Sequence, residues 1–157
     1  DAVTGLPNLN KFEHYLAEKA HEDKSAKPFS VFMRVSVRNI KEYEDAYGEP
    51  TIDYLLRILA SRFVRTFETN NSGNASVFKC DSANFFIHLH QDFNEEGQSI
   101  NAAKAYAQLI QEQVLAPITL HNSLLTIETQ TISCTVPIKY FSFKKYASCC
   151  HASPYAK

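Results

Sequence analysis

The sequence predicts a mixed α/β (α+β) domain in which helices cover the faces of one largely antiparallel sheet. Two observations carry this prediction. Segments with apolar residues at helical spacing alternate along the chain with segments in which apolar and polar residues alternate. Two stretches of the chain have the pattern of a hairpin, in which two neighbouring strands pair antiparallel. At 157 residues, the chain suits a single domain with one hydrophobic core.

Composition narrows the class of protein. The chain is 45% hydrophobic and 21% charged, with a net charge of -1 and no block of Lys or Arg, which argues against a nucleic-acid surface. Its apolar runs fall short of the ~20 residues of a membrane span. The chain starts at Asp1 and its single methionine is Met33, so we expect a cytoplasmic domain excised from a larger protein, with no membrane contact of its own.

The cysteines and histidines do not predict a metal site. Four cysteines occur without a C-x-x-C pair, so we expect them to be reduced. Cys149-Cys150-His151 lacks zinc-site spacing. His88 and His90 alternate onto one strand face as a ligand pair could, but we expect ordinary strand histidines because no third ligand is apparent nearby.

The first half of the chain predicts a helix, a strand and two further helices. After a turn containing Gly5 and Pro7, with Asn8 as helix cap, residues 9–23 have helical periodicity. Residues 29–37 alternate as a strand. A short helix over 39–47 ends at Gly48, and Pro50 suits the first turn of a longer helix over 51–67.

The second half begins with a hairpin over residues 77–90. Its turn contains no Gly or Pro, although Asp81 and Asn84 tolerate turn conformations better than most residues. A helix over 99–115 follows, stopped by Pro117. A second hairpin is predicted with strands 118–120 and 124–136 around a turn at 121–123, and the tail 144–157 is weakly helical.

Several stretches together resemble the GGDEF domains of bacterial diguanylate cyclases. The opening DAVTGLPN is similar to the family's D-x-L-T-G-L-P-N, and the hairpin turn falls where the signature G-G-D/E-E-F belongs. The resemblance spans nearly the whole chain, so residues 1–157 are expected to form one GGDEF domain. The further matching positions are Ile40, Lys41, Asp45, Gly48, Asp53, Leu56, Ser133-Cys134-Thr135 and Ala156-Lys157.

The resemblance implies a palm-like fold related to class III nucleotide cyclases, with a mostly antiparallel five-stranded sheet flanked by helices. It also implies chemistry in which two GGDEF subunits, each holding one GTP, form cyclic di-GMP with the help of two metal ions. Such ions need carboxylate oxygens from the protein.

The residues that the family uses for metal binding are replaced here. The two metal-carboxylate positions correspond to Ser36 and Ala83, and Arg38 would repel a cation. The acidic fourth signature residue is Asn84, followed by the matching Phe85. The two signature glycines, which allow close approach of the nucleotide, are Asp81 and Ser82. We therefore expect a degenerate signature with no catalytic residues and no bound metal.

The positions that contact the nucleotide in the family are partly kept. Lys41 and Lys157 match phosphate contacts, Asp53 matches an acidic partner of guanine, and Glu44 replaces an Asn. The ordinary structural roles are favoured over nucleotide contacts: a solvated helix lysine for Lys41 and a first-turn acid favoured by the helix dipole for Asp53. The family's inhibitory R-x-x-D corresponds to residues 72–75, Ser-Gly-Asn-Ala, so product feedback is not expected.

The sequence thus predicts a catalytically inactive regulatory or interaction module of a bacterial cyclic di-GMP signalling protein. Its expected partners are protein domains: an adjacent EAL phosphodiesterase domain, a sensor domain or a second GGDEF copy. Two alternatives stay open, a domain that binds GTP as an allosteric signal and an active cyclase that uses other ligands. No cofactor is expected, although residual binding of GTP and Mg²⁺ is compatible with Lys41 and Asp53.

Overall fold

The computed structural model describes residues 1–22, 27–68, 74–120 and 123–137. Their main sheet has four strands: β1 (Phe29–Val37), β2 (Ala75–Lys79), β3 (Asn84–Leu89) and β6 (Thr129–Pro137). The strand order is β2-β3-β1-β6, and every neighbouring pair is antiparallel. The predicted antiparallel sheet is therefore present. The fifth predicted strand is not part of this sheet within the described residues.

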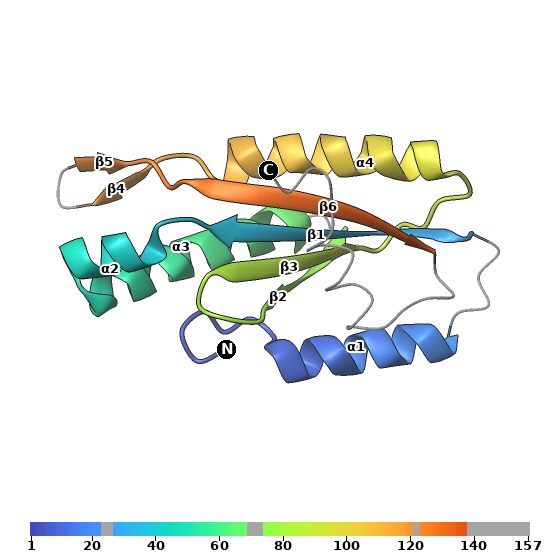
Figure 1. Cartoon of the computed structure of the whole chain (residues 1–157), viewed down its shortest axis with the longest axis horizontal. Helices are drawn as coiled ribbons and strands as arrows, with labels where there is room; N and C mark the ends of the chain where they lie inside the picture. Colours follow the sequence, from blue (N-terminus) through green and yellow to red (C-terminus); the bar gives the residue numbers. More distant parts are fainter. Residues whose placement is uncertain (23–26, 69–73, 121–122, 138–157) are drawn as a thin grey trace.

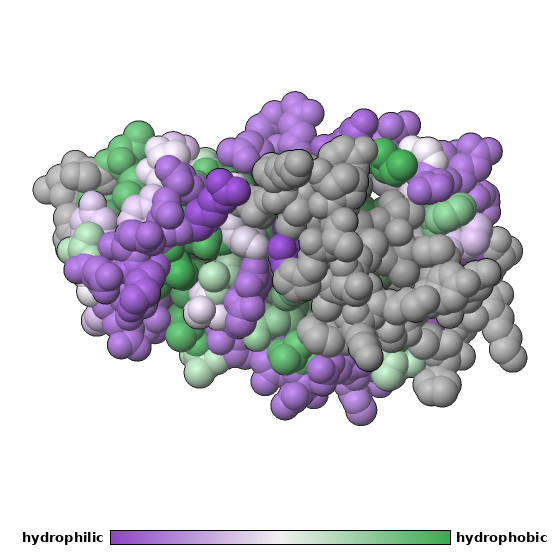
Figure 2. Space-filling view, viewed as in Figure 1, coloured by the Kyte–Doolittle hydropathy of each residue, from purple (hydrophilic) through white to green (hydrophobic). Residues whose placement is uncertain are grey.

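The helices cover both faces of the sheet (Figure 1). Helix α1 (Leu9–Glu22) lies on one face, whereas α3 (Glu49–Glu68) and α4 (Glu96–Leu109) pack on the other. The short α2 (Ile40–Tyr47) follows β1 and packs against α3. Figure 2 shows hydrophilic residues over the outer sides of α1 and α4, as amphipathic helices require.

The second predicted hairpin is wrong in its extent. Strand β4 (Ile118–Leu120) pairs only with the short β5 (Ser123–Leu125), and the chain then leaves this two-stranded ribbon to form β6 beside β1. The β-branched residues over 124–136 predict one strand, because strand propensity does not specify the pairing partner. Backbone groups between β5 and β6 bond instead to the β1–α2 junction, where Arg38 N–H donates to the Glu128 carbonyl at 2.8 Å.

The predicted helix over 99–115 also differs in detail. Helix α4 begins three residues earlier, at Glu96, and its last turn continues as a π-helix, η1 (Ile110–Val114). The Leu115 N–H closes that turn on the Ile110 carbonyl at 3.0 Å. The predicted helix over 51–67 corresponds to α3, and the predicted helix over 9–23 corresponds to α1. The predicted tail helix lies outside the described residues.

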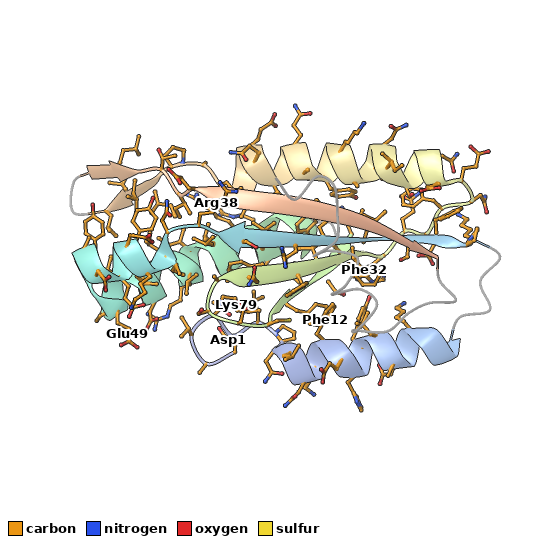
Figure 3. All side chains as sticks on the ribbon, in the orientation of Figure 1. Asp1, Phe12, Phe32, Arg38, Glu49 and Lys79 are labelled. Carbon is orange, nitrogen blue, oxygen red and sulfur yellow. The ribbon has the colours of Figure 1, made fainter. Side chains whose placement is uncertain are left out.

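The two faces of the sheet follow the alternation of β1. Val31, Met33 and Val35 are buried toward α3, together with Phe85 and Ile87 from β3. The opposite parity places Phe32 on the α1 side of the sheet, where it stacks on His88, and Phe12 of α1 packs against Phe78 and Phe86 on the same side (Figure 3). Among the described helices, none is both long and apolar enough to cross a membrane.

Candidate functional site

The β2–β3 turn lies against the end of β1. The Val37 N–H donates to the Ala83 carbonyl at 2.8 Å, and Ser36 is the register partner of Asn84. Asp81 and Ser82 are exposed, Ala83 and Asn84 are half-buried, and Phe85 is fully buried against Phe63 of α3. The structure therefore brings together the two positions that the resemblance assigned to metal carboxylates, Ser36 and Ala83.

The turn is built by the Asp81 side chain. Asp81 Oδ1 accepts hydrogen bonds from the backbone N–H groups of Ala83 and Asn84, both at 2.9 Å. Asn84 Nδ2 also donates to Asp81 Oδ1 and Oδ2, at 2.8 and 2.7 Å. An aspartate whose carboxylate accepts from the backbone amides two and three residues later shapes a tight turn without glycine. The carboxylate is consequently engaged by its own loop.

Ser36 completes this network from the neighbouring strand. Its hydroxyl donates to Asn84 Oδ1 at 2.5 Å. Asn84 thus accepts from Ser36 with its oxygen and donates to Asp81 with its nitrogen, which satisfies both ends of the amide. We call Ser36, Asn84 and Asp81 the turn network. The turn network joins two neutral side chains, Ser36 and Asn84, to the Asp81 carboxylate. It lies where the family resemblance requires two metal-binding carboxylates.

The turn network does not fit a pair of divalent cations. Hard cations take several oxygen ligands, preferably carboxylates, at about 2.0–2.6 Å. Ala83 offers only a methyl group, and the Ser36 hydroxyl and Asn84 amide are already bonded to each other. Asp81 is the network's single carboxylate, and it already accepts from its own loop. Across the described part of the chain, no group of three or more His, Cys, Asp or Glu side chains could hold a metal ion.

The segment after β1 is held in shape by Glu128. Arg38 is exposed, and Asn39 adopts the left-handed conformation, with φ of 57°, directly before α2. The Asn39 amide donates to Glu128 Oε2 at 2.7 Å, and the Glu128 carbonyl accepts from Arg38 N–H. Asparagine adopts this conformation at lower cost than most residues. Arg38 is two residues after Ser36 and follows the last residue of β1.

The predicted nucleotide contacts of the described residues lie on two neighbouring helices. Lys41 and Glu44 are exposed on α2, and Asp53 is half-buried in the first turns of α3. The hollow between α2, α3 and the end of β1 has a volume of only about 10 Å³ and apolar walls that include Tyr43, Ile52 and Ile127. That volume holds about one water molecule, and Lys41, Glu44 and Asp53 lie outside its lining. Lys157 lies outside the described residues.

Lys79 is a residue of this site that the sequence reasoning missed. It ends β2 on the core-facing side and is only 4% exposed. Its ammonium donates to the Asp81 carbonyl and lies 5.6 Å from the centre of the Phe85 ring. Burial lowers the Lys79 pKa, partly offset by Asp81. The signal was available, because Lys79 shares the strand parity of the buried Ala75 and Val77.

The remaining titratable groups near the sheet are structural. Burial, reinforced by the Asp81 charge, raises the Cys80 pKa to about 12, so the thiol stays protonated at neutral pH. Burial lowers the His88 pKa to about 3, with smaller contributions from Lys19 and His90. His88 lies between the Tyr15 hydroxyl, at 2.5 Å, and the Ser30 hydroxyl, at 2.8 Å. His90 is bonded to Ser76 at 2.7 Å. His88 is a strand residue as predicted, whereas His90 lies directly after the end of β3, and each has a hydrogen-bond partner.

Comparison with known proteins identifies the family. The model for the family described as "Diguanylate cyclase, GGDEF domain" matches residues 1–147, so the chain belongs to the GGDEF domain family. No curated protein matches the chain by sequence. The predicted fold class is confirmed by solved structures, to which this chain is similar in fold.

Three of these structures illustrate the similarity. A sensory box/GGDEF family protein from Caulobacter crescentus CB15 is 18% identical, with 99% of this chain and 94% of that chain covered and a TM-score of 0.78. The GGDEF domain of DgcB from Caulobacter crescentus, solved with c-di-GMP, is 16% identical, with coverages of 99% and 85% and a TM-score of 0.76. Diguanylate cyclase SiaD from Pseudomonas aeruginosa, solved with its activator SiaC, is 16% identical, with coverages of 97% and 55% and a TM-score of 0.74.

Proposed function

We propose that this GGDEF domain is catalytically inactive and acts as a regulatory or interaction module of a bacterial cyclic di-GMP signalling protein. The turn network is the observation that supports this proposal. Ser36 and Asn84 satisfy each other's polar groups, and Ala83 contributes no ligand atom. Two-metal phosphoryl chemistry needs contributions of several kcal/mol from its ions, and ~1.4 kcal/mol is already tenfold in rate.

A cyclase assay tests the inactivity. The purified chain is incubated with GTP and either Mg²⁺ or Mn²⁺, and cyclic di-GMP is quantified by mass spectrometry. We expect no product above a heat-inactivated control. Cyclic di-GMP formed by the unmodified chain, in proportion to its concentration, would overturn the proposal. Such a result would establish the alternative of an active cyclase with other ligands.

A rebuilt signature provides the matched comparison. The variant combines Ser36→Asp, Ala83→Asp and Asn84→Glu with Asp81→Gly and Ser82→Gly. It restores the metal carboxylates and the glycines, and it removes the turn network. Cyclic di-GMP formed by this variant alone would attribute the inactivity of the natural chain to these five positions.

The second alternative is a domain that binds GTP without converting it. Lys41, Glu44 and Asp53 are its candidate contacts, on the neighbouring helices α2 and α3. Calorimetric titration with GTP and Mg²⁺ separates the two. Heat of binding that disappears in Asp53→Ala and persists in the exposed control Asn101→Ala would favour the GTP-binding function.

A regulatory role requires contacts that differ between two states of the full protein. The candidate surfaces are the β2–β3 turn and helix α3, and the candidate partners are an adjacent EAL or sensor domain or a second GGDEF copy, in the cytoplasm. SiaD, a diguanylate cyclase with the same fold, is solved with an activator protein, which makes a protein partner a reasonable expectation. Ser82→Arg should change the output of the full-length protein, whereas Asn101→Arg on α4 should not.

A further inference from the structure

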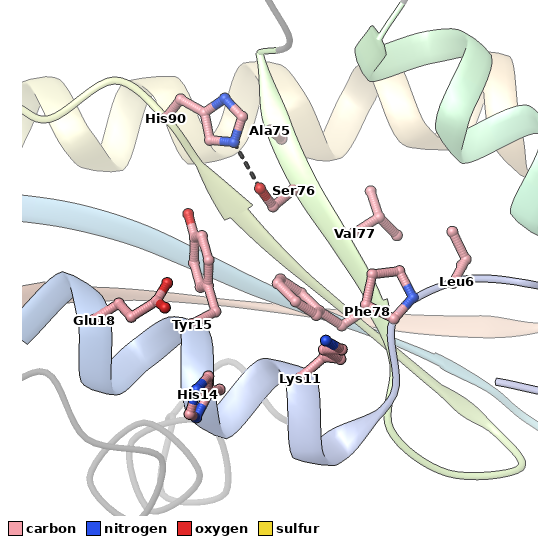
Figure 4. Close-up of a pocket in the computed structure, with 11 residues that line it drawn as sticks. Leu6, Lys11, His14, Tyr15, Glu18, Ala75, Ser76, Val77, Phe78 and His90 are labelled. Atoms are coloured by element: carbon pink, nitrogen blue, oxygen red, sulfur yellow. Dashed lines mark hydrogen bonds between the residues drawn. The ribbon is translucent and has the colours of Figure 1, made fainter.

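An open groove runs between helix α1 and the edge strand β2, on the far side of the fold from β6 (Figure 4). Its volume is about 690 Å³. Strand β2 supplies one wall from Ala75 to Phe78, and α1 supplies the other with exposed, mostly polar residues and Tyr15. Leu6 and Pro7 lie at one end, and His90 lies at the other.

The backbone of β2 presents unused hydrogen-bonding groups to this groove. The His90 N–H donates to the Asn74 carbonyl, at 3.0 Å, so Asn74 faces β3 and the alternate residues Ala75, Val77 and Lys79 direct their backbone groups away from β3. Lys79 confirms this parity, because its N–H donates outward to the Pro7 carbonyl at 2.9 Å. In the described structure, the outward groups of Ala75 and Val77 have no such partner.

We propose that this groove binds an extended peptide segment of a partner protein, which adds to the sheet as a strand beside β2. Unpaired edge groups favour this mode of recognition, since a peptide backbone supplies both donors and acceptors. The bond from Lys79 to Pro7 already shows a chain segment seated along the same edge. A bound peptide would continue that line of bonds to Val77 and Ala75.

The charges on α1 give the peptide a direction. Lys11 lies below Phe78 near the Leu6 end, and Glu18 lies beside Tyr15 toward the His90 end (Figure 4). They are seven positions apart on the helix, about 10 Å. Side chains that share one face of an extended strand are two or four residues apart, about 7 or 13 Å, and the long Lys11 and Glu18 side chains can reach residues four apart. The antiparallel arrangement places the amino end of the peptide at Lys11. The peptide should therefore carry Asp or Glu followed four residues later by Lys or Arg, on the same face of the strand, with apolar residues at the alternate positions between them.

A second copy of this chain fits the groove less well. An antiparallel β2–β2 pair would be related by a two-fold axis perpendicular to the sheet, which places both α1 helices on the same side. Each α1 already forms the second wall of its own groove. A single strand avoids that conflict, so the peptide is the occupant that the geometry favours.

The test uses two fluorescein-labelled peptides and the whole chain. One peptide is Ser-Thr-Glu-Val-Thr-Val-Lys-Ser, and the other exchanges its Glu and Lys. Fluorescence anisotropy should show tighter binding of the first peptide by about two- to fivefold, the range of an exposed ion pair. The double variant Lys11→Glu/Glu18→Lys should reverse this preference, and Lys104→Glu on α4 should leave it unchanged. Absence of saturable binding of either peptide up to about 1 mM would overturn the proposal.

A backbone variant tests the pairing itself. Val77→Pro removes the outward N–H without breaking the bonds between β2 and β3, since Val77 does not face β3 with that group. Its matched control, Val77→Ala, also shortens the side chain but keeps the N–H. With both variants folded by circular dichroism, we expect peptide affinity to fall about tenfold further in Val77→Pro than in Val77→Ala. Equal affinities would contradict strand addition, as would a dimer of the natural chain that Val77→Pro dissociates.

Discussion

The two faces of the sheet are packed by different means. Toward α3 and α4, the strands present aliphatic side chains and Phe85, which pack against Leu59, Phe63 and their neighbours. Toward α1, the layer is aromatic and contains a polar centre. Phe12 lies 4.8 Å from Phe78 and 5.4 Å from Phe86, between ring centroids, and His88 stacks on Phe32 at 4.4 Å.

The two faces differ in how strongly their packing depends on directional hydrogen bonds. Aliphatic packing depends on buried area and shape, and it is insensitive to pH. The α1 face also depends on the hydrogen-bond chain Tyr15–His88–Ser30, in which one ring nitrogen donates and the other accepts. That chain links α1 to the sheet through the imidazole, which burial keeps neutral. The two faces should therefore respond differently to truncation, to pH and to removal of single polar groups.

The largest effect is expected on the α3 face. Phe63 is fully buried and contacts Phe85 at 4.9 Å and Phe67 at 6.4 Å, between centroids. Phe63→Ala should lower the free energy of unfolding by about 3–5 kcal/mol, through lost burial and the cavity left behind. Chemical denaturation at pH 7 and pH 5 measures it. A loss that differs strongly between the two pH values would contradict the assignment of pH sensitivity to the other face.

Acidification should act through the α1 face. The His88 pKa is about 3 in the folded protein, below its ordinary value of 6.5. The unfolded chain therefore binds the extra proton as pH falls below about 6.5, and the folded protein does not until about pH 3. The contribution of His88 to stability is complete above pH 6.5 and is lost on acidification through that window, by up to about 1.4 kcal/mol per pH unit.

Denaturation curves between pH 7 and pH 4 check this slope. The matched control is His88→Phe, which cannot titrate and keeps a ring to stack on Phe32. The difference in slope between the natural chain and this variant isolates His88 from the carboxylates. Identical slopes would show that His88 is not held neutral in the folded protein.

Removal of the central ring at constant pH should have a smaller effect. At pH 7, His88→Phe leaves the Tyr15 and Ser30 hydroxyls without their imidazole partner, at a cost of about 1–3 kcal/mol. The triple variant Tyr15→Phe/Ser30→Ala/His88→Phe should recover part of that loss, because it removes the orphaned hydroxyls as well. Additive losses in a mutant cycle would argue against a coupled chain.

The smallest effect is expected at the turn network. Ser36→Ala removes the hydroxyl that donates to Asn84 and should cost about 0.5–1.5 kcal/mol, because Asn84 remains bonded to Asp81 and is only half-buried. Urea denaturation measures it, with Ser82→Ala as an exposed control that should change little. If Ser36→Ala lowered the free energy of unfolding more than His88→Phe, the polar groups of the turn would contribute more to stability than those of the α1 face.

Much of the fold followed from local sequence. The periodicity of Phe12 and Leu16, the alternation of β1 and the stop at Gly48 each act within a few residues, and each element formed where it was predicted. The pairing after β4 was not predicted, because β-branched residues favour a strand without specifying its partner. The turn at Asp81 was predicted from its residue types, but its bonds to Asn84 required coordinates in space.

Residue type alone determined which groups stand at the two positions that the resemblance assigns to metal carboxylates: a hydroxyl at Ser36 and a methyl at Ala83. Only the tertiary structure decided what those positions do instead, because Ser36 and Asn84 come from different strands and meet through the β1–β3 register. The same holds for Lys79, His88 and the open edge of β2. Their burial, partners and exposure depend on which elements pack against them, and that information is distributed over the whole chain.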